Sequence, residues 1–378
     1  MFRLKMNIGF DAKRAFLNNT GLGNYSRNCI NALSCTNLPL KYYLYSPYFK
    51  NNDRTRFMYK LDNTVHKHPQ RIFDKMFKSY WRSKSIVKDL IQDNIDVFHG
   101  LSNEIPLSIE NTNIKSVVTI HDLIFLRYPE LFSKIDKKIY EYKFKSSCIR
   151  ADKIIAVSKQ TKEDIINFFK IPERKIEVVY QGCNKVFQNK INKEELIKVS
   201  SKYNLPESFL LYVGTIEKRK NLLTILKSIK DLENQNLVVV GNGKKYQQEC
   251  IKYISQEKMS SRVFFLSNIS LIELASVYQL AEILIYPSIF EGFGIPIIEA
   301  LFSETPVITS TNGCFKEAGG PSSIYIDPLS SESIKKSILK IQKSKELKQK
   351  MISDGIAHAQ KFTHEKISSQ LHNIYTKL

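Results

Sequence analysis

Short runs of apolar residues alternate with segments of helical periodicity along most of the chain. Segments 25–33, 71–91 and 159–169 place apolar residues three and four positions apart, which is the spacing of one helix face. Strands that are apolar throughout and separated by helices are typical of parallel sheets covered on both faces. The pattern therefore predicts an α/β fold. The expected strands are 7–11, 41–45, 97–99, 117–120, 153–157 and 176–179 in the first half, and 209–213, 237–240, 263–265, 283–286, 307–309 and 323–326 in the second.

The alternation is interrupted between residues 181 and 204, where polar residues follow Gly182. A chain of 378 residues exceeds the length at which a single core stops growing. We therefore place a domain junction in this segment and expect two domains, 1–190 and 191–362. Two open parallel sheets create a cleft at the carboxyl ends of their strands, the usual place for a ligand. The last segment, 363–378, has an amphipathic helical pattern and needs an apolar partner surface in one of the two domains.

The composition narrows the class of partner. Lys and Arg number 57 against 37 Asp and Glu, which leaves a formal charge of +20 and favours phosphate-bearing or membrane-surface partners. The six cysteines form no CxxC pair and no zinc-ligand spacing with histidine, so we expect a reducing cytoplasm and neither a metal site nor a disulfide framework. Because no apolar run approaches ~18 residues, we expect a soluble or peripheral protein.

Segment 71–88 combines an apolar helix face with basic residues largely off that face. Such a helix lies either on an anionic membrane or on the protein's own sheet, and we expect the sheet. The apolar residues are Ile72, Phe73, Met76, Phe77, Tyr80 and Trp81, and the basic residues are Lys75, Lys78, Arg82, Lys84 and Lys88.

The strongest candidate site is the segment YPSIFEGFGIPIIEALFSETPVI, residues 286–308. It runs from an expected strand through a turn with Gly292 and Gly294 into a helix. The glycines permit close approach of the backbone, and free amides at a helix start favour an anion such as a diphosphate. Glu291 in the turn and Glu299 about two turns into the helix can accept hydrogen bonds from sugar or ribose hydroxyls. The alternative is a glycine-rich turn followed by a surface helix.

Arg219 and Lys220 lie just beyond the carboxyl end of the expected strand 209–213. At that place Arg219 can form paired hydrogen bonds with phosphate oxygens, and Lys220 can supply a point charge. A solvated loop is the alternative for this charge pair.

His121 ends the expected strand 117–120, which directs it into the same inferred cleft. A structural histidine is the alternative. His99 ends the expected strand 97–99 and is the second candidate, with a position in the core as its alternative.

Gly21 and Gly23 lie in a segment that resembles a dinucleotide fingerprint only at first, because Ser26 stands where the third glycine belongs. This weakens an interpretation as an oxidoreductase. We expect a flexible loop that meets phosphate at the cleft, with a helix starting at Asn24 or Tyr25.

Taken together, these segments resemble the retaining glycosyltransferases of family four, also called glycosyltransferases group one. The most specific part is the pair Glu291 and Glu299, with seven residues between them. The resemblance implies a GT-B fold, in which two Rossmann-like parallel-sheet domains face each other across a cleft. It also implies that the first domain binds the acceptor, that the second binds the nucleotide sugar, and that the last helix packs back on the first. The supporting segments are IHD at 120–122, residues 151–165, RKN at 219–221 and the glycine segment at 21–23.

The resemblance also implies roles for individual residues. Arg219 and Lys220 would hold the donor diphosphate, and Glu299 would hold the ribose. Glu291, together with the turn at Phe293 and Gly294, would bind the transferred sugar. The chain departs from many family members at Thr215, where they carry an arginine that Arg219 would replace here. His121 would contact the sugar near the reacting carbon, and the remaining donor-binding candidates are Gly21, Gly23, Ser288 and Gly292.

The RKN segment and the HDL followed by YPELF look most like mannosyltransferases of bacterial surface-polysaccharide synthesis. The implied activity is metal-independent, retaining transfer of mannose from GDP-mannose to a glycan or a polyprenyl-diphosphate-linked glycan. We expect no cofactor, no metal and no nucleic acid, a cytoplasmic location, and an anionic membrane surface at its inner face as a further candidate partner. The alternatives are another UDP-sugar-dependent hexosyltransferase, a sugar-nucleotide 2-epimerase of the same fold, and a basic RNA- or membrane-binding protein.

Overall fold

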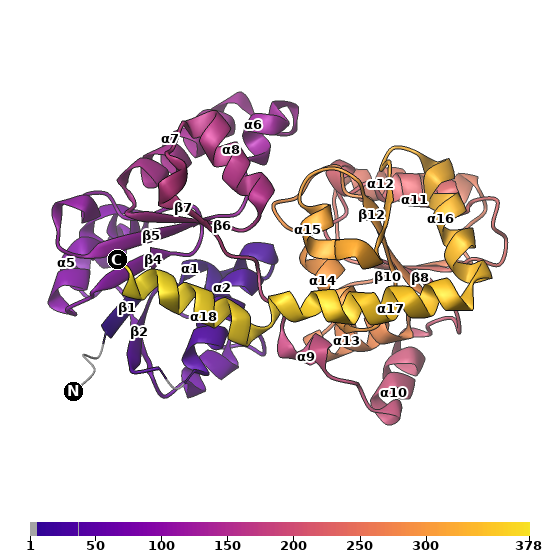
Figure 1. Ribbon diagram of the computed structural model, residues 1–378, viewed down its shortest axis with the longest axis horizontal. Helices are drawn as coiled ribbons and strands as arrows, with labels where there is room; N and C mark the ends of the chain where they lie inside the picture. The colour runs from indigo at the N-terminus through magenta and orange to yellow at the C-terminus, as the bar shows by residue number, and fades with distance from the viewer. Residues whose placement is uncertain (1–5, 37) are drawn as a thin grey trace. The chain divides into compact units, whose positions relative to one another are not determined.

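The computed structural model describes residues 6–36 and 38–378. The chain forms two compact units (Figure 1): unit 1 is Met1–Gly182 with His364–Leu378, and unit 2 is Cys183–Thr363. The division follows Gly182, ahead of the boundary expected at residue 190. Each unit contains its own sheet of parallel strands, so the predicted α/β fold with two Rossmann-like domains is confirmed.

The sheet of unit 1 has seven strands, all parallel, in the order β3-β2-β1-β4-β5-β6-β7. The order reverses between β1 and β4, which is the topological switch point of a doubly wound sheet. The strands are β1 (Met6–Asp11), β2 (Leu40–Tyr45), β3 (Thr64–Lys67), β4 (Val97–Gly100), β5 (Lys115–Ile120), β6 (Lys153–Ala156) and β7 (Ile176–Val178).

Helices and short helical turns connect these strands. They are α1 (Lys13–Leu17), α2 (Gly21–Ser34), η1 (Arg56–Lys60), α3 (Ile72–Met76), α4 (Lys78–Tyr80), η2 (Trp81–Ser85), α5 (Ile86–Gln92), η3 (Ile109–Asn111), α6 (Ile124–Arg127), η4 (Pro129–Leu131), α7 (Lys134–Arg150), α8 (Lys159–Phe169), η5 (Glu173–Lys175) and, from the end of the chain, α18 (His364–Thr376).

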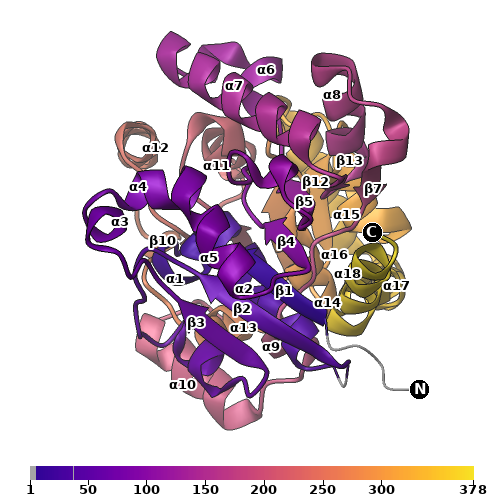
Figure 2. The same ribbon diagram turned by 90° about the vertical axis from the view of Figure 1, so that its left-hand side faces the viewer.

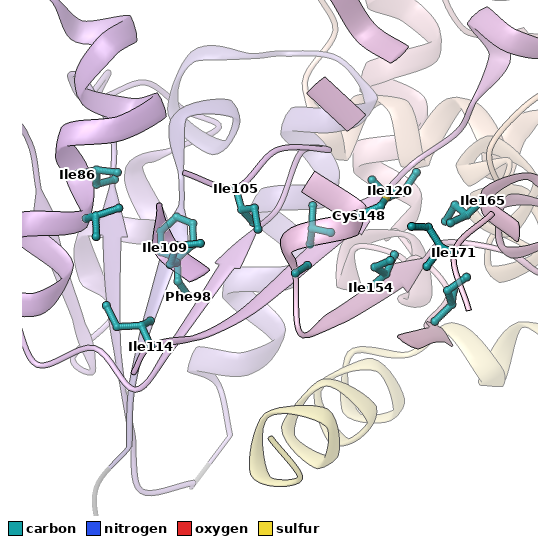
Figure 3. Packing of buried hydrophobic residues seen from close by; sticks show 14 of the residues in the cluster. Ile86, Phe98, Ile105, Ile109, Ile114, Ile120, Cys148, Ile154, Ile165 and Ile171 are labelled. Carbon is teal, nitrogen blue, oxygen red and sulfur yellow. The ribbon is translucent and has the colours of Figure 1, made fainter. Parts of the chain in front are cut away.

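A buried apolar cluster joins the helices of unit 1 to its sheet (Figure 3). Ile86 of α5, Cys148 of α7 and Ile165 of α8 belong to the same cluster as Phe98 of β4 and Ile154 of β6. Strands that are apolar on the helix-covered face account for this cluster, as expected for a doubly wound sheet.

The C-terminal helix α18 packs against α2 within unit 1. Its Tyr375 hydroxyl is 2.7 Å from Nδ1 of the buried His99, whose Nε2 is 2.8 Å from the Thr119 hydroxyl. The Tyr25 hydroxyl of α2 is 3.0 Å from the same Thr119 oxygen. Burial lowers the pKa of His99 to about 3, so this histidine is neutral and links α18 to the sheet. His99 therefore belongs to the core, the alternative to its being a site residue.

The sheet of unit 2 repeats the same topology with six parallel strands, in the order β10-β9-β8-β11-β12-β13. Its switch point lies between β8 and β11. The strands are β8 (Leu210–Val213), β9 (Leu237–Val240), β10 (Val263–Leu266), β11 (Ile283–Tyr286), β12 (Val307–Ser310) and β13 (Ile324–Ile326).

The helices and turns of unit 2 surround this sheet. They are α9 (Lys185–Gln188), α10 (Lys193–Tyr203), η6 (Lys218–Lys220), α11 (Leu222–Ile229), α12 (Lys245–Gln256), α13 (Leu271–Leu280), α14 (Ile295–Phe302), α15 (Phe315–Gly319), η7 (Gly320–Ser322), α16 (Ser331–Lys343), α17 (Lys345–Ala359) and η8 (Gln360–Phe362).

Segment 71–91 does not form the single helix that its periodicity predicted. It is divided into α3, α4, the π-helical turn η2 and α5. Of its expected apolar face, Trp81 is buried, whereas Ile72, Phe73, Met76, Phe77 and Tyr80 are exposed. The prediction that this face packs on the sheet is therefore wrong for all but Trp81.

One further expectation, the start of a helix, is corrected by the structure, and the segment of the expected domain junction contains two helices. The helix expected to start at Asn24 or Tyr25 begins at Gly21, so both glycines lie in its first turn rather than in a loop. The polar segment 181–204 contains the helices α9 and α10, because Asn184 and Asn192 cap them by accepting hydrogen bonds from the backbone N–H of Val186 and Glu195.

Within the described residues, no helix has the length and apolar character required to cross a bilayer.

Candidate active site

The switch point of unit 2 brings together two segments that are distant in the sequence. The chain leaves β8 through Gly214 and reaches Arg219 and Lys220 in the turn η6, while the chain leaving β11 reaches Ser288 and Glu291. The backbone carbonyl of Arg219 accepts a hydrogen bond of 2.8 Å from the N–H of Ile289, which joins the two segments directly. The carboxyl ends of neighbouring strands at a switch point are the usual ligand position in this topology.

Gly214 explains how Lys220 reaches the site. Its φ of +145° is a conformation that side chains rarely adopt, and a Cβ there would lie 3.1 Å from Cδ of Lys220. The glycine therefore allows the aliphatic part of Lys220 to pass over the backbone. The ammonium then lies 5.1 Å from the centroid of the Tyr286 ring and donates a hydrogen bond of 2.9 Å to the Tyr286 hydroxyl.

Glu291 is the centre of this cluster. Its Oε1 is 2.9 Å from each of four donors, namely the Arg219 guanidinium, the Lys220 ammonium and the hydroxyls of Tyr286 and Ser288. Burial alone would raise the pKa of Glu291, but the charges of Lys220 and Arg219 outweigh it and lower that pKa to about 2. Glu291 is therefore ionised at neutral pH. Its Oε2 has no hydrogen-bond partner in the described part of the chain.

The turn after Glu291 is fixed by contacts with its own backbone. The Cys314 thiol donates to the carbonyl oxygens of Glu291 and Phe293, at 3.2 Å and 2.8 Å. Gly294 has a φ of +119° and immediately precedes α14, so it sets the direction in which that helix starts. The Phe293 ring is buried against Phe362, 5.4 Å between centroids, so its side chain supports the turn and only its backbone remains for a ligand.

Glu299 is the fifth residue of α14, just past its first turn, and is almost buried, with 8% of its surface exposed. Its Oε2 accepts a hydrogen bond of 2.9 Å from the hydroxyl of Tyr278 on α13. Burial raises the pKa of Glu299 to about 7, and the Tyr278 hydrogen bond offsets only part of this effect. The two carboxylates of the motif thus differ in charge state: Glu291 is ionised, whereas Glu299 is half protonated near neutral pH.

His121 belongs to unit 1, where it ends β5. Its Nε2 donates 2.9 Å to the carbonyl of Leu101, so Nδ1 is the acceptor and receives a hydrogen bond of 3.4 Å from the Gln181 amide. Burial is the main cause that lowers the pKa of His121 to about 4. The ring is neutral, and Tyr25 packs edge-on against it at 4.6 Å.

Gly21 and Gly23 lie in the first turn of α2, the helix that carries Tyr25. A Cβ at Gly23 would lie 1.8 Å from the carbonyl oxygen of Asn18, whereas a Cβ at Gly21 would meet nothing within 4 Å. A glycine is thus required at position 23, because its backbone lies too close to the Asn18 carbonyl for any side chain. Gly21 has open space around it.

The structure thus joins Arg219, Lys220, Ser288 and Glu291 by direct contacts, and the turn places Gly292, Phe293 and Gly294 beside them. Glu299 is held separately on α14. His121, Gly21 and Gly23 belong to unit 1 and form a separate group around α2.

Three residues of this site were not identified from the sequence: Tyr286, Tyr278 and Cys314. Tyr286 is the last residue of an expected strand, and a hydroxyl at that end was the available signal. The other two come from α13 and the start of α15, and no local pattern relates them to the motif. In the described part of the chain, no group of three or more His, Cys, Asp or Glu is placed to hold a metal ion.

The topology and the charges of unit 2 are those of a nucleotide-binding α/β protein, with two cations and a helix start at the switch point. Comparison with protein families is more specific. The model of the Glycosyltransferase Family 4 domain matches residues 43–185, and that of the Glycosyl transferases group 1 domain matches residues 193–358. The chain therefore belongs to these glycosyltransferases, a class of enzymes.

Individual relatives and structures agree with this assignment. The chain is 31% identical over 60% of its length to the O-antigen chain mannosyltransferase RfbU of Salmonella typhimurium, of which it covers 60%. It is 25% identical over 75% of its length to the O-antigen chain mannosyltransferase B of Escherichia coli, of which it covers 74%. The crystal structure of a glycosyltransferase from Rickettsia africae has a TM-score of 0.77 at 19% identity, with 99% of both chains covered. The predicted GT-B fold is thus confirmed.

Proposed function

We propose that the protein transfers mannose from GDP-mannose to a glycan, or to a glycan linked to a polyprenyl diphosphate, in the synthesis of a cell-surface polysaccharide. The family supports transfer of a sugar, and the names of the two relatives support mannose and O-antigen synthesis. The observation that carries the proposal is the cluster of Arg219, Lys220 and Glu291 at the switch point of unit 2.

The cations of this cluster suit the departure of a nucleoside diphosphate. Negative charge develops on the diphosphate as the bond to the sugar breaks, and fixed positive charge nearby stabilises that state. Arg219 is held by ion pairs with Glu217 and Glu291, and the side chain of Lys220 lies against the backbone at Gly214. Little reorganisation of either side chain is therefore needed when the donor binds. Glu291 pairs with both cations and Glu217 pairs with Arg219, and these ion pairs keep both side chains in place.

The two carboxyl groups suit the two sugars of the donor. Glu291 keeps Oε2 for a hydroxyl of the transferred mannose, while its Oε1 remains on the cations and on Tyr286. Glu299 accepts hydroxyl hydrogen bonds from the ribose, since it lies further along α14 from the phosphate-binding helix start.

We propose retention of configuration without a metal ion. In this mechanism the acceptor hydroxyl attacks the face from which the diphosphate leaves, and a phosphate oxygen of the leaving group takes the acceptor proton. Arg219 and Lys220 supply the charge that a divalent cation would otherwise supply. A cytoplasmic location at the inner face of the cell membrane fits a lipid-linked acceptor.

A donor panel tests this proposal. Thermal unfolding and donor turnover are measured with GDP-mannose, UDP-glucose, UDP-N-acetylglucosamine, UDP-galactose and ADP-glucose, each with and without EDTA. We expect a selective upward shift with GDP-mannose, insensitive to EDTA, and NMR of the transferred sugar is expected to show the α-anomer that the donor carries. A selective shift with a UDP-sugar would instead assign another hexosyltransferase, and loss of turnover in EDTA would refute metal independence.

A matched pair of variants tests the site itself. Arg219→Ala is expected to lower donor turnover about a hundredfold, because it removes a charge aimed at the leaving group. Lys218→Ala is the control, since Lys218 lies on the same turn η6 but is exposed. Equal donor turnover by Arg219→Ala and Lys218→Ala would exclude the proposed role of Arg219.

A further inference from the structure

Five large apolar side chains between residues 72 and 80 face solvent in unit 1. They belong to α3, α4 and the residue that joins them, and Figure 2 shows these two short helices at the edge of unit 1. Monomeric soluble proteins rarely leave contiguous apolar residues exposed without a function. The exposed fractions are 80% for Ile72, 56% for Phe73, 72% for Met76, 50% for Phe77 and 44% for Tyr80. We call these five residues the 72–80 surface.

The 72–80 surface is held outward by defined polar contacts. Trp81, the next residue, is buried, and its indole N–H donates 2.6 Å to Oδ2 of Asp89. The other oxygen of Asp89 pairs with Arg71 at 2.5 Å, and Arg71 also lies 3.5 Å from the buried Asp74. The segment is thus anchored on both sides of the surface. Its apolar residues are exposed because the anchors direct them away from the core.

The aromatic residues of the surface contact one another. The Phe73 ring lies 4.7 Å from that of Phe77 and 5.7 Å, edge-on, from that of Tyr80. They form a small projecting aromatic group, with Ile72 and Met76 as the most exposed members beside it. Tyrosine at its margin suits the boundary between an apolar and an aqueous phase.

The segment that carries this group is mainly basic, although Arg71 and Arg82 are paired with carboxylates. Residues 71–88 contain six Lys or Arg and one acidic residue, Asp74, which is 6 − 1 = +5. Asp74 is buried beside Arg71, so its charge does not reach the exposed side. The basic residues Lys75, Lys78, Lys84 and Lys88 are exposed and form no ion pair with any described residue.

We propose that the 72–80 surface inserts into an anionic lipid bilayer, with these four lysines on the headgroups. Large exposed apolar side chains in a segment with exposed lysines outside ion pairs are complementary to a surface that is negative outside and apolar inside. The proposal goes beyond the function proposed above, because it concerns binding of the protein to lipid in the absence of donor and acceptor.

Vesicle co-sedimentation of the full chain tests this inference. The probes are phosphatidylcholine vesicles with and without phosphatidylglycerol, at low and high salt. We expect binding to the anionic vesicles alone, with weaker binding at high salt because lysine–headgroup attraction is screened. Equal recovery with neutral and anionic vesicles at low salt would overturn the proposal.

Two sets of variants locate the binding surface. Ile72→Ser with Met76→Ser is expected to lower the affinity for anionic vesicles at least tenfold, and Lys75→Glu with Lys78→Glu is expected to do the same. The control is Ile135→Ser with Tyr142→Ser on α7, which removes comparably exposed apolar residues from another helix of unit 1. Unchanged vesicle binding of the first variant would overturn the proposal.

Two further measurements separate the inference from other causes. The unfolding temperature of Ile72→Ser with Met76→Ser is expected to match that of wild type, because both residues are exposed. Its GDP-mannose turnover in detergent-free buffer is expected to be within about twofold of wild type, because these residues are distant in sequence from unit 2. A failure of donor turnover in all proteins would count against the proposed function and leave vesicle binding as a separate result. Light scattering that shows a wild-type dimer and a monomeric variant, with no vesicle binding by either, would assign the surface to a second copy of the chain and overturn the proposal.

Discussion

Glu299 is expected to make the stability of the protein depend on pH. The raised pKa of about 7, against an ordinary value of 4.5, means that the folded chain keeps a proton at Glu299 that the unfolded chain releases. The unfolded state therefore binds fewer protons between these two values, and the free energy of unfolding falls as pH rises through this window. At about one pH unit above the folded pKa both states are ionised, and the loss is nearly complete.

The size of this effect follows from the difference between the two pKa values. One pKa unit corresponds to about 1.4 kcal/mol, so the complete loss is about 3 kcal/mol. Between about pH 5 and about pH 8 the part that develops is about 2.5 kcal/mol, since a fraction is already lost at the lower pH. Glu299→Gln removes the ionisation and keeps an oxygen that can accept the hydrogen bond from Tyr278.

Urea denaturation at the two pH values measures the change. The stability of Glu299→Gln relative to wild type is expected to be about 2.5 kcal/mol more favourable at about pH 8 than at about pH 5. The exposed Glu233→Gln is the control for removal of a surface charge in the same unit. The Tyr278 hydroxyl lowers the pKa of Glu299, so Tyr278→Phe should raise that pKa. In this variant the free energy of unfolding should therefore continue to fall to a higher pH than in wild type. A pH-independent difference between Glu299→Gln and wild type would refute the argument from burial.

Two further predictions concern unit 1, and urea denaturation checks both. Gly23→Ala is expected to cost about 3 kcal/mol or more, because its Cβ would lie 1.8 Å from the Asn18 carbonyl oxygen, whereas Gly21→Ala should be neutral or gain about 0.5 kcal/mol. Equal effects of the two changes would contradict the geometry of this turn. Tyr375→Phe should cost about 1–3 kcal/mol, since it leaves Nδ1 of His99 buried without its partner, and a loss below about 0.5 kcal/mol would show that this link does not hold α18 in place.

The sheets were predictable from the sequence because their strands are apolar on both faces. Strand β3 was missed because three of the four residues in its sequence, TVHK, are polar and the strand lies at the edge of the sheet, where burial is incomplete. The helix α7 was missed for a similar reason: of its seventeen residues, only Ser147 and Cys148 are buried, so it lacks the apolar stripe of a packed helix. Periodicity identifies elements that bury one face and fails for those that do not.

Segment 71–91 shows a different limit of the pattern. The apolar spacing of a core-facing helix is present, but Trp81 and the anchors at Asp74 and Asp89 decide which residues turn inward. Amphipathic spacing describes a helix that has an apolar face, and it does not distinguish a protein core from a membrane as the partner of that face.

Part of the candidate site, the charged residues that follow β8 and β11, was predicted from the sequence, whereas its geometry and three of its residues were not. Arg219 and Glu291 are far apart in the sequence, and each follows a strand, so their meeting depends on β8 and β11 being neighbours. The contrast between ionised Glu291 and half-protonated Glu299 required the tertiary structure. Their partners, two cations for one and Tyr278 for the other, come from other elements of unit 2.

Transfer of radiolabelled mannose is the most direct test of the proposed activity. The full chain is incubated with labelled GDP-mannose and the lipid-linked glycan fraction of cells that make the polysaccharide, alongside Arg219→Ala and Lys218→Ala. We predict label in the glycan with wild type and Lys218→Ala, and about a hundredfold less with Arg219→Ala. Label transferred from a UDP-hexose but not from GDP-mannose, or undiminished transfer by Arg219→Ala, would contradict the account.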